Sequence, residues 1–216
     1  MLNRTNQIII FAKITHSALF GGHGGFFYKY METKERVAIY IDGNNFYHKL
    51  KDLKVPNTVN FNYLEFCNKL ARGRNVVSYR YYVGAIRAKE GDIKGQQLRT
   101  GQLNLFNNLL KQRFTIKKGH FLLNDCKYHE KGVDVKIAVD LLVGAYDDIY
   151  DTAILVSSDS DLNPAVKKIK HLGKKLEYIG FSHLPCFALQ KDATLSRLLI
   201  KDDLDEFIVP SLPLGQ

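Results

Sequence analysis

The stretch Val37-Ala38-Ile39-Tyr40-Ile41-Asp42-Gly43-Asn44-Asn45 decides the fold. Its hydrophobic residues run without alternation into a turn-forming sequence, which predicts a strand that is buried on both faces and ends at Asp42. A second run of this kind, at residues 153–156, leads into Ser157-Ser158-Asp159-Ser160-Asp161. Strands of this type are typical of parallel sheets that helices cover on both sides.

Strand and helix patterns alternate along the rest of the chain. Segments rich in β-branched and aromatic residues predict further strands at 76–83, 114–123 and 176–179. Helical spacing and turn signals predict helices at 44–52, 61–70, 96–112, 133–145 and 164–172, with short C-terminal helices at 195–199 and 204–208. This order predicts the α/β class, with three layers around a central parallel sheet of about five strands.

The length and composition of the chain fit a single globular domain. The chain has 216 residues, of which 45% are hydrophobic and 25% charged, which excludes a mainly disordered or disulfide-scaffold protein. We expect one domain over residues 36–209 and a short tail at 210–216. Because Met31 precedes the first strand as an ordinary start would, residues 1–35 are expected to be an extension, either flexible or derived from a mis-assigned start. The alternative is an extra strand at residues 8–14.

The cysteines and the apolar segments indicate the cellular compartment of the protein. Cys67, Cys126 and Cys186 are far apart and form no Cys-x-x-Cys pair, so we expect a reducing, cytoplasmic compartment. No uncharged apolar stretch is long enough to cross a bilayer, so no membrane association is expected. The apolar segment at 207–209 suits either a homo-oligomer contact or a cap over the core.

Four aspartates fall where parallel sheets bind ligands, beyond the carboxyl ends of the strands. Asp42 ends the first strand, Asp159 and Asp161 follow the strand at 153–156, and Asp134 begins the helix before that strand. These acids converge if the two strands are neighbours. Clustered carboxylates repel each other unless a cation is present, and such hard oxygen ligands suit Mg²⁺ or Mn²⁺. A metal ion held there would activate water for the hydrolysis of a phosphodiester.

Each of these acids also has a purely structural interpretation. An aspartate followed by glycine at the end of the first strand suits a simple turn. Asp134 suits the cap of the helix that it begins, and Asp159 or Asp161 suits the cap of the helix that follows. Asp140 lies six residues after Asp134 and is therefore rotated away from it on the same helix, which favours a structural or supporting role.

Four sequence motifs carry a family resemblance. In chain order they are Ile41-Asp42-Gly43-Asn44-Asn45, Glu130-Lys131-Gly132-Val133-Asp134-Val135, Val139-Asp140-Leu141-Leu142 and Ser158-Asp159-Ser160-Asp161-Leu162. Together they resemble the NYN domain proteins of the LabA-like group, over roughly residues 36–182. The resemblance implies a PIN-like fold with sheet order 3-2-1-4-5, in which the first and fourth strands are neighbours.

The resemblance also implies an activity, that of a metal-dependent ribonuclease. Carried over motif by motif, the carboxylates that bind Mg²⁺ or Mn²⁺ and take part in catalysis are Asp42, Asp134, Asp159 and Asp161, and the supporting hydrogen-bonding residues are Asn45 and Ser158. The chain departs from the family at Ser158, where relatives often have glycine. The alternative is a catalytically inactive module of this family that binds RNA or regulates a partner.

Positive charge is concentrated in one part of the chain. The formal net charge is +9, and residues 67–120 contain twelve lysines and arginines against two acids. Within this region, the segment after the strand at 76–83 and the helix that follows it supply the candidate phosphate contacts Arg87, Lys89, Lys94 and Arg99. Residues 134–161, in contrast, hold seven aspartates and one lysine. This segregation predicts RNA, single-stranded or structured, as the partner.

Overall fold

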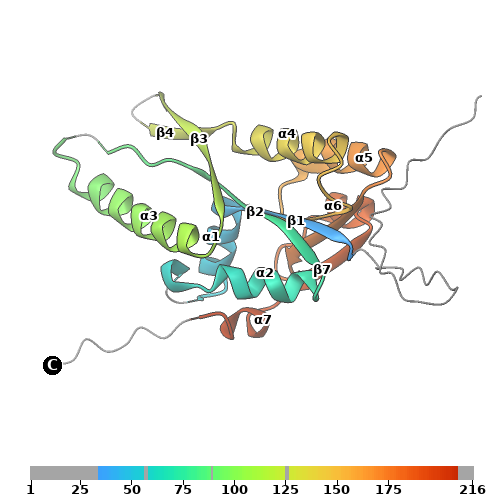
Figure 1. Cartoon of the computed structure of the whole chain (residues 1–216). Coiled ribbons are helices and arrows are strands. Elements are labelled where there is room, and N and C mark those ends of the chain that lie inside the picture. The colour runs from blue at the N-terminus through green and yellow to red at the C-terminus, as the bar shows by residue number, and fades with distance from the viewer. Residues whose placement is uncertain (1–33, 56–57, 89, 125–126, 209–216) are drawn as a thin grey trace, which may run out of the picture. The chain divides into compact units, whose positions relative to one another are not determined.

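The central feature of the molecule is a twisted, seven-stranded sheet. The computed structural model describes residues 34–55, 58–88, 90–124 and 127–208 (Figure 1). Within these residues the strand order is β4-β3-β2-β1-β5-β6-β7. The parallel strands are β1 (Arg36–Asp42), β2 (Asn75–Gly84), β3 (Thr115–Asn124), β5 (Thr152–Val156), β6 (Lys175–Phe181) and β7 (Leu195–Leu199), and β4 (Lys127–Lys131) is antiparallel to β3.

The predicted fold class and strand order are confirmed, but the predicted number of strands is too low. The five parallel strands that the sequence indicates occur in the order 3-2-1-4-5, so β1 and β5 are neighbours. Residues 195–199 were expected to form a helix and instead form β7, which pairs with β6. Their leucines at 195, 198 and 199 have helical spacing, but the free edge of β6 provides a strand with hydrogen-bonding partners.

Helices cover both faces of the sheet (Figure 1). The first face carries α1 (Gly43–Asp52), α2 (Tyr63–Ala71), α3 (Ile93–Lys111), α7 (Asp202–Asp205) and the short helix η1 (Thr58–Asn60). The second face carries α4 (Val133–Tyr146), α5 (Asn163–His171) and α6 (Phe187–Asp192), and the short helix η2 (Ser160–Leu162) precedes α5. Within the described residues, no helix is both long and apolar enough to cross a membrane.

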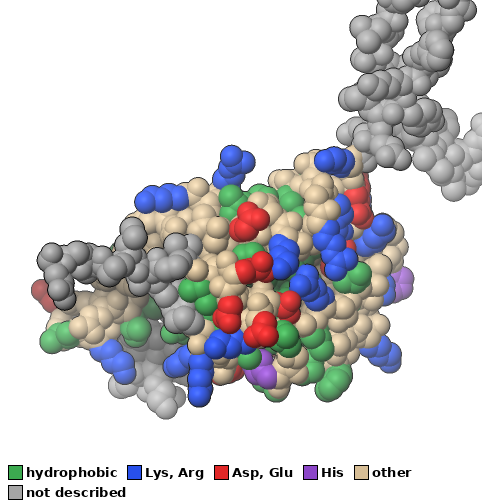
Figure 2. All heavy atoms as spheres, turned by 90° about the horizontal axis from the view of Figure 1, so that it is seen from below, with side chains coloured by type: hydrophobic (Ala, Val, Ile, Leu, Met, Phe, Trp, Pro, Cys, Tyr) green, Lys and Arg blue, Asp and Glu red, His purple; other side chains and the backbone are tan. Residues whose placement is uncertain are grey.

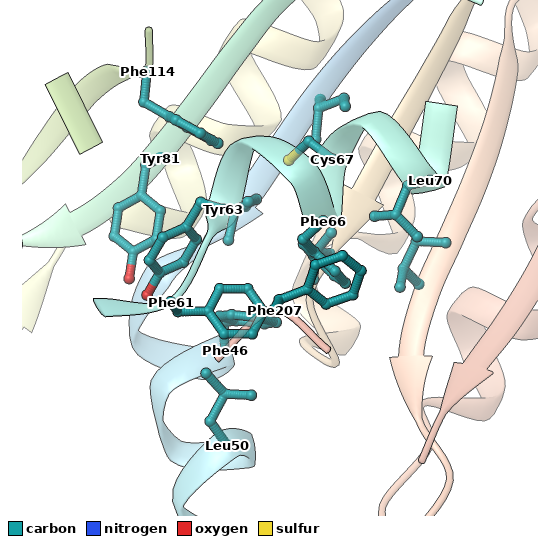
Figure 3. Packing of buried hydrophobic residues seen from close by; sticks show 14 of the residues in the cluster. Phe46, Leu50, Phe61, Tyr63, Phe66, Cys67, Leu70, Tyr81, Phe114 and Phe207 are labelled. Carbon is teal, nitrogen blue, oxygen red and sulfur yellow. The ribbon is translucent and has the colours of Figure 1, made fainter. Parts of the chain in front are cut away.

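Aromatic side chains fill the core beneath α1 and α2 (Figure 3). Phe46 of α1 contacts Phe61 and Phe66 with ring centroids 5.7 and 5.5 Å apart, and Phe207 lies 5.8 Å from Phe61. Phe207 is 3% exposed. This residue therefore caps the core, which is one of the two alternatives for the segment at 207–209. Val209 lies outside the described residues.

The core beneath α4 is built from tyrosines that fix this helix to the sheet. Tyr40 of β1 stacks on Tyr82 of β2 with ring centroids 6.2 Å apart. Tyr150 is fully buried and donates a hydrogen bond of 2.7 Å to the carbonyl oxygen of Leu141. Gly144 allows this approach, because a Cβ atom there would lie 2.7 Å from the ring of Tyr150. These contacts hold the C-terminal half of α4 against the sheet.

Charged side chains of both signs share the face seen in Figure 2. Acidic side chains gather in the middle of this face, with lysines and arginines beside them. Lys69 of α2 and Glu206, which directly follows α7, form an ion pair. Because both signs of charge lie side by side here, the part of this face that the structure describes differs from the one-sign surface expected for binding a polyanion.

Candidate metal centre

Three carboxylates from distant parts of the chain meet at the carboxyl edge of the sheet. β1 ends at Asp42, and β5, its neighbour, ends one residue before Ser157 and leads into Asp159. Asp134 lies in the first turn of α4. One carboxylate oxygen from each of Asp42, Asp134 and Asp159 lies within 4.8 Å of the others. This group is the only one of its kind among the described residues.

Asp42 is the buried member of the group, with 4% of its surface exposed. Its Oδ1 accepts a hydrogen bond of 3.1 Å from the backbone N–H of Asn45, and its Oδ2 accepts one of 2.9 Å from the hydroxyl of Ser157. The pKa of Asp42 is raised to about 6, mainly by burial and also by the charges of Asp134 and Asp159, while the two hydrogen bonds act in the opposite direction. Asp42 is therefore a helix cap and a member of the cluster at the same time.

Asp134 is not a helix cap. The N-cap of α4 is Gly132, whose positive φ of 79° suits glycine, so the side chain of Asp134 is left facing the other acids. The partial burial of its carboxylate raises the pKa of Asp134, and the charges of Asp159 and Asp161 add to the effect. Repulsion between carboxylates that share one site therefore adds to the effect of burial on the pKa of both Asp42 and Asp134.

Asp159 and Asp161 hold different positions in the turn after β5. Asp159 is half-buried, and its Oδ1 accepts a hydrogen bond of 2.9 Å from the backbone N–H of Asp161, which caps η2. Asp161 is exposed and is not part of the group of three. Its charge nevertheless acts on Asp134. Of the four acids predicted to share the site, the structure brings three together and leaves the fourth at the rim.

The predicted supporting residues hold the backbone at this edge in place. The side-chain Oδ1 of Asn45 accepts a hydrogen bond of 3.1 Å from the backbone N–H of Ser158, which ties α1 to the turn after β5. The hydroxyl of Ser158 is buried and has no hydrogen-bond partner within the described residues. Ser157, which the sequence reasoning did not single out, is fully buried and also accepts from the N–H of Asp159 at 3.1 Å.

Gly43 lets α1 begin directly against β2. A Cβ atom at this position would lie 2.2 Å from the ring of Tyr81, so any other residue would push the helix away. The hydroxyl of Tyr81 donates a hydrogen bond of 3.3 Å to the carbonyl oxygen of Gly43. The glycine after Asp42 therefore has a packing role in positioning the N-terminus of α1 beside the cluster.

Asp140 lies in a separate polar network beneath α4. Its Oδ2 accepts a hydrogen bond of 2.7 Å from the hydroxyl of Tyr82 and lies 3.4 Å from the guanidinium of Arg80 and 3.5 Å from the ammonium of Lys117. Arg80 also stacks over the ring of Tyr40, 5.4 Å from its centroid. This network joins α4 to β2 and β3, and the structure places Asp140 in it rather than with the three clustered acids.

The candidate phosphate contacts are free, exposed cations. Arg87 is exposed in the segment after β2, and Lys94 and Arg99 are exposed on α3. None of the three forms an ion pair with another described residue. Lys89 lies outside the described residues. The exposed three are therefore available to an anionic ligand.

The fold and the acidic cluster agree with the comparison with known protein families. The sequence model of the NYN domain matches residues 36–206. The chain belongs to the NYN domain family. NYN domains are part of the PIN-like nuclease superfamily, which makes a nuclease the class of protein to consider.

One solved structure and the curated proteins complete the comparison. A crystal structure of a protein of unknown function from Vibrio parahaemolyticus is 25% identical to this NYN protein and has a TM-score of 0.61. The match covers 82% of this chain and 99% of that chain. A search of the curated proteins found no significant match. The likeness therefore supports the fold and leaves the substrate to be inferred from the site.

Proposed function

We propose that this NYN protein is a metal-dependent ribonuclease that hydrolyses phosphodiesters of RNA. The observation that carries the proposal is the meeting of Asp42, Asp134 and Asp159, whose oxygens lie within 4.8 Å of one another at the carboxyl edge of the sheet. Ligands of open α/β sheets bind at this edge. PIN-like nucleases have acidic sites of this kind, which supports a hydrolase of nucleic acid over other uses of the fold.

The donor set fits a hard divalent cation. The three ligands are carboxylates, two of which have raised pKa values because burial and their neighbours disfavour the charged form. Asp42, Asp134 and Asp159 would hold Mg²⁺ or Mn²⁺, with Asp161 at the rim. When bound, such an ion lowers the pKa of water and offsets charge on a phosphate.

The chain's own residues would fix the geometry of the reaction. Ser157 and the N–H of Asn45 direct the two oxygens of Asp42, so this ligand does not need to reorganise when a cation binds. Asp161 is exposed, and its charge adds to the raised pKa of Asp134, so it would contribute negative charge at the rim of the site. Arg87, Lys94 and Arg99 would hold the phosphates of a single-stranded or structured RNA.

The test is cleavage of single-stranded and structured RNA with Mn²⁺ or Mg²⁺. We expect Asp159→Asn to reduce the cleavage rate at least about 100-fold, because it replaces a charged ligand by a neutral one. Asp205→Asn is the matched control, since Asp205 is an exposed acid on α7 outside the cluster, and it should cleave at the wild-type rate. Equal rates for wild type and Asp159→Asn would refute the assignment of the site.

A catalytically inactive RNA-binding module is the second candidate. It is favoured by the position of Asp161, which is not part of the clustered group that the family resemblance implies. In this case the protein would bind RNA with a strong dependence on salt, because lysines and arginines release counterions from phosphates. Salt-dependent binding without cleavage in either metal would establish this candidate and exclude the ribonuclease.

A further inference from the structure

The outward face of α4 is apolar although it faces solvent. Val135, Val139, Val143 and Tyr146 are 64, 49, 45 and 61% exposed, and Leu142 beside them is half-buried. The opposite face of the helix, with Ile137 and Leu141, is fully buried against the sheet. A helix that is hydrophobic on all sides is normally buried on all sides. A further surface is therefore expected to cover this face.

The spacing of the exposed residues indicates that the covering surface is a helix. Val135, Val139, Leu142 and Tyr146 follow one another at intervals of four, three and four residues, the spacing of the a and d positions of a coiled coil. At about 100° per residue they lie within an arc of about 60°, and the row is about 16 Å long. Within α4 no charged residue lies in this arc, and the ammonium of Lys168 on α5 lies 5.9 Å from the ring centroid of Tyr146 at one end of the row. Such a row packs best against a second helix with the same spacing.

We propose that α4 pairs with α4 of a second copy of this chain, antiparallel and across a two-fold axis. The charges beside the row support this partner and this direction. Lys136 and Asp147 are eleven residues apart, so they lie on the same side of the row, near its opposite ends. In an antiparallel pair related by a two-fold axis, the flank that carries these charges lies on the same side of both helices. Lys136 of each copy then lies beside Asp147 of the partner subunit, which gives two equivalent contacts, one on each side of the axis.

The neighbours of these two charges leave them available for such a contact. Asp147 is exposed and has no ion-pair partner within the described residues. The ammonium of Lys136 donates to the carbonyl oxygen of Lys118, which uses one of its three hydrogens. A parallel pair would instead place the two lysines at one end and the two aspartates at the other. The charges therefore favour the antiparallel arrangement.

The first test is the mass of the full chain in solution, measured by light scattering between about 1 and 200 µM. We expect a dimer that dissociates on dilution, and we expect Val139→Lys to raise its dissociation constant at least about tenfold by placing like charges in the row. Leu110→Lys is the matched control, because Leu110 is a similarly exposed apolar residue on α3 and should leave the dimer intact. A wild-type monomer throughout this range, or a dimer unaffected by Val139→Lys, would overturn the proposal.

A charge exchange tests the direction of the pair. Asp147→Lys alone should weaken the dimer, and Lys136→Asp added to it should restore the dimer, because the attractive pairs then re-form with reversed sign. Failure of the double variant to recover would contradict the antiparallel arrangement. Flotation with phosphatidylserine vesicles distinguishes another occupant: a monomer that floats, and that Val139→Lys releases from the vesicles, would show a lipid contact and exclude the dimer.

Discussion

Asp42 has two structural partners that are far apart in the sequence. One of its oxygens caps α1 by accepting from the backbone N–H of Asn45, which is three residues away. The other accepts from the hydroxyl of Ser157, which is 115 residues away. Both oxygens are thus directed by fixed donors, and one of them lies within 4.8 Å of a carboxylate oxygen of Asp134 and of Asp159. A cap and a ligand are compatible roles for one carboxylate, so the capping interpretation of such an aspartate does not argue against a site.

The raised pKa of Asp42 predicts how the stability of the metal-free protein depends on pH. Its pKa is about 6 in the folded chain against 3.8 for a free aspartate, so between these values the folded state binds more protons than the unfolded state. The contribution of Asp42 therefore falls as the pH rises from about 4 to 6, by on the order of 3 kcal/mol.

Urea unfolding in the presence of a chelator, repeated across this pH range, measures the effect. Asp42→Asn cannot ionise and should flatten the slope between pH 4 and about 6 relative to wild type. An unchanged slope in this variant would show that Asp42 has an ordinary pKa in the folded protein.

Gly43 offers a second prediction at this scale. Gly43→Ala places a Cβ atom 2.2 Å from the ring of Tyr81 and should cost about 1 to 3 kcal/mol of unfolding free energy. Gly101→Ala is the control, because Gly101 lies inside α3 with no atom within 4 Å of the new Cβ, and it should stabilise the protein by about 0.5 to 1 kcal/mol. Urea unfolding measures both, and a neutral Gly43→Ala would contradict the packing role.

The sequence predicted the three acids because each follows or begins an element at the active edge of the sheet. It could not predict Ser157, because two serines stand side by side and only the register of the strand decides which hydroxyl meets Asp42. The structure gives Ser157 the buried position beside Asp42 and turns Ser158 so that its backbone N–H reaches Asn45. The only feature of the sequence that indicates a buried role for Ser157 is its position directly after Val156, the last buried residue of β5.

At the scale of elements, the network around Asp140 fixes α4 to the sheet. Tyr82→Phe keeps the ring that stacks on Tyr40 but removes the hydroxyl that donates to Asp140. We expect a loss of about 1 to 2 kcal/mol of unfolding free energy, because a half-buried carboxylate loses a hydrogen bond.

Urea unfolding of Tyr82→Phe beside Tyr47→Phe tests this role. Tyr47 is exposed, and its hydroxyl has no hydrogen bond within the described residues, so this control should lie within about 0.5 kcal/mol of wild type. Equal stability of the two variants would show that the network does not hold α4 in place.

Two strands that sequence reasoning missed are defined by their partners. β4 is a polar strand without apolar alternation, and it exists through its antiparallel pairing with β3. β7 has the leucine spacing of a helix and becomes a strand because β6 has a free edge. Strands of this kind at the edges of a sheet depend on pairing more than on their own pattern, whereas the buried central strands are evident from the sequence.

At the scale of the whole molecule, the binding of a cation should stabilise the fold. A ligand that binds only the folded state at about one hundred times its dissociation constant adds about 2.7 kcal/mol. For a chain of this length the melting temperature should then rise by on the order of 5 to 10 °C on addition of Mg²⁺ or Mn²⁺.

Asp159→Asn should abolish most of this rise, and Asp205→Asn should retain it, in a thermal scan that needs no RNA. An equal rise in all three proteins would mean that the cations act elsewhere. The readout is independent of cleavage, so it also applies if the protein binds RNA without cutting it.

The pairing of β1 with β5 determines when, during synthesis and folding, the acidic centre can form. The two strands that carry Asp42 and lead to Asp159 are parallel neighbours, separated in sequence by α1, α2, β2, α3, β3, β4 and α4. Contacts between such distant segments form late, after the intervening loop has been closed. On a ribosome, Asp42 emerges long before Ser157 and Asp159 exist. The centre is therefore incomplete throughout most of synthesis, and on the proposed function a nascent chain would gain its activity only after Asp159 has been added and β5 has paired with β1.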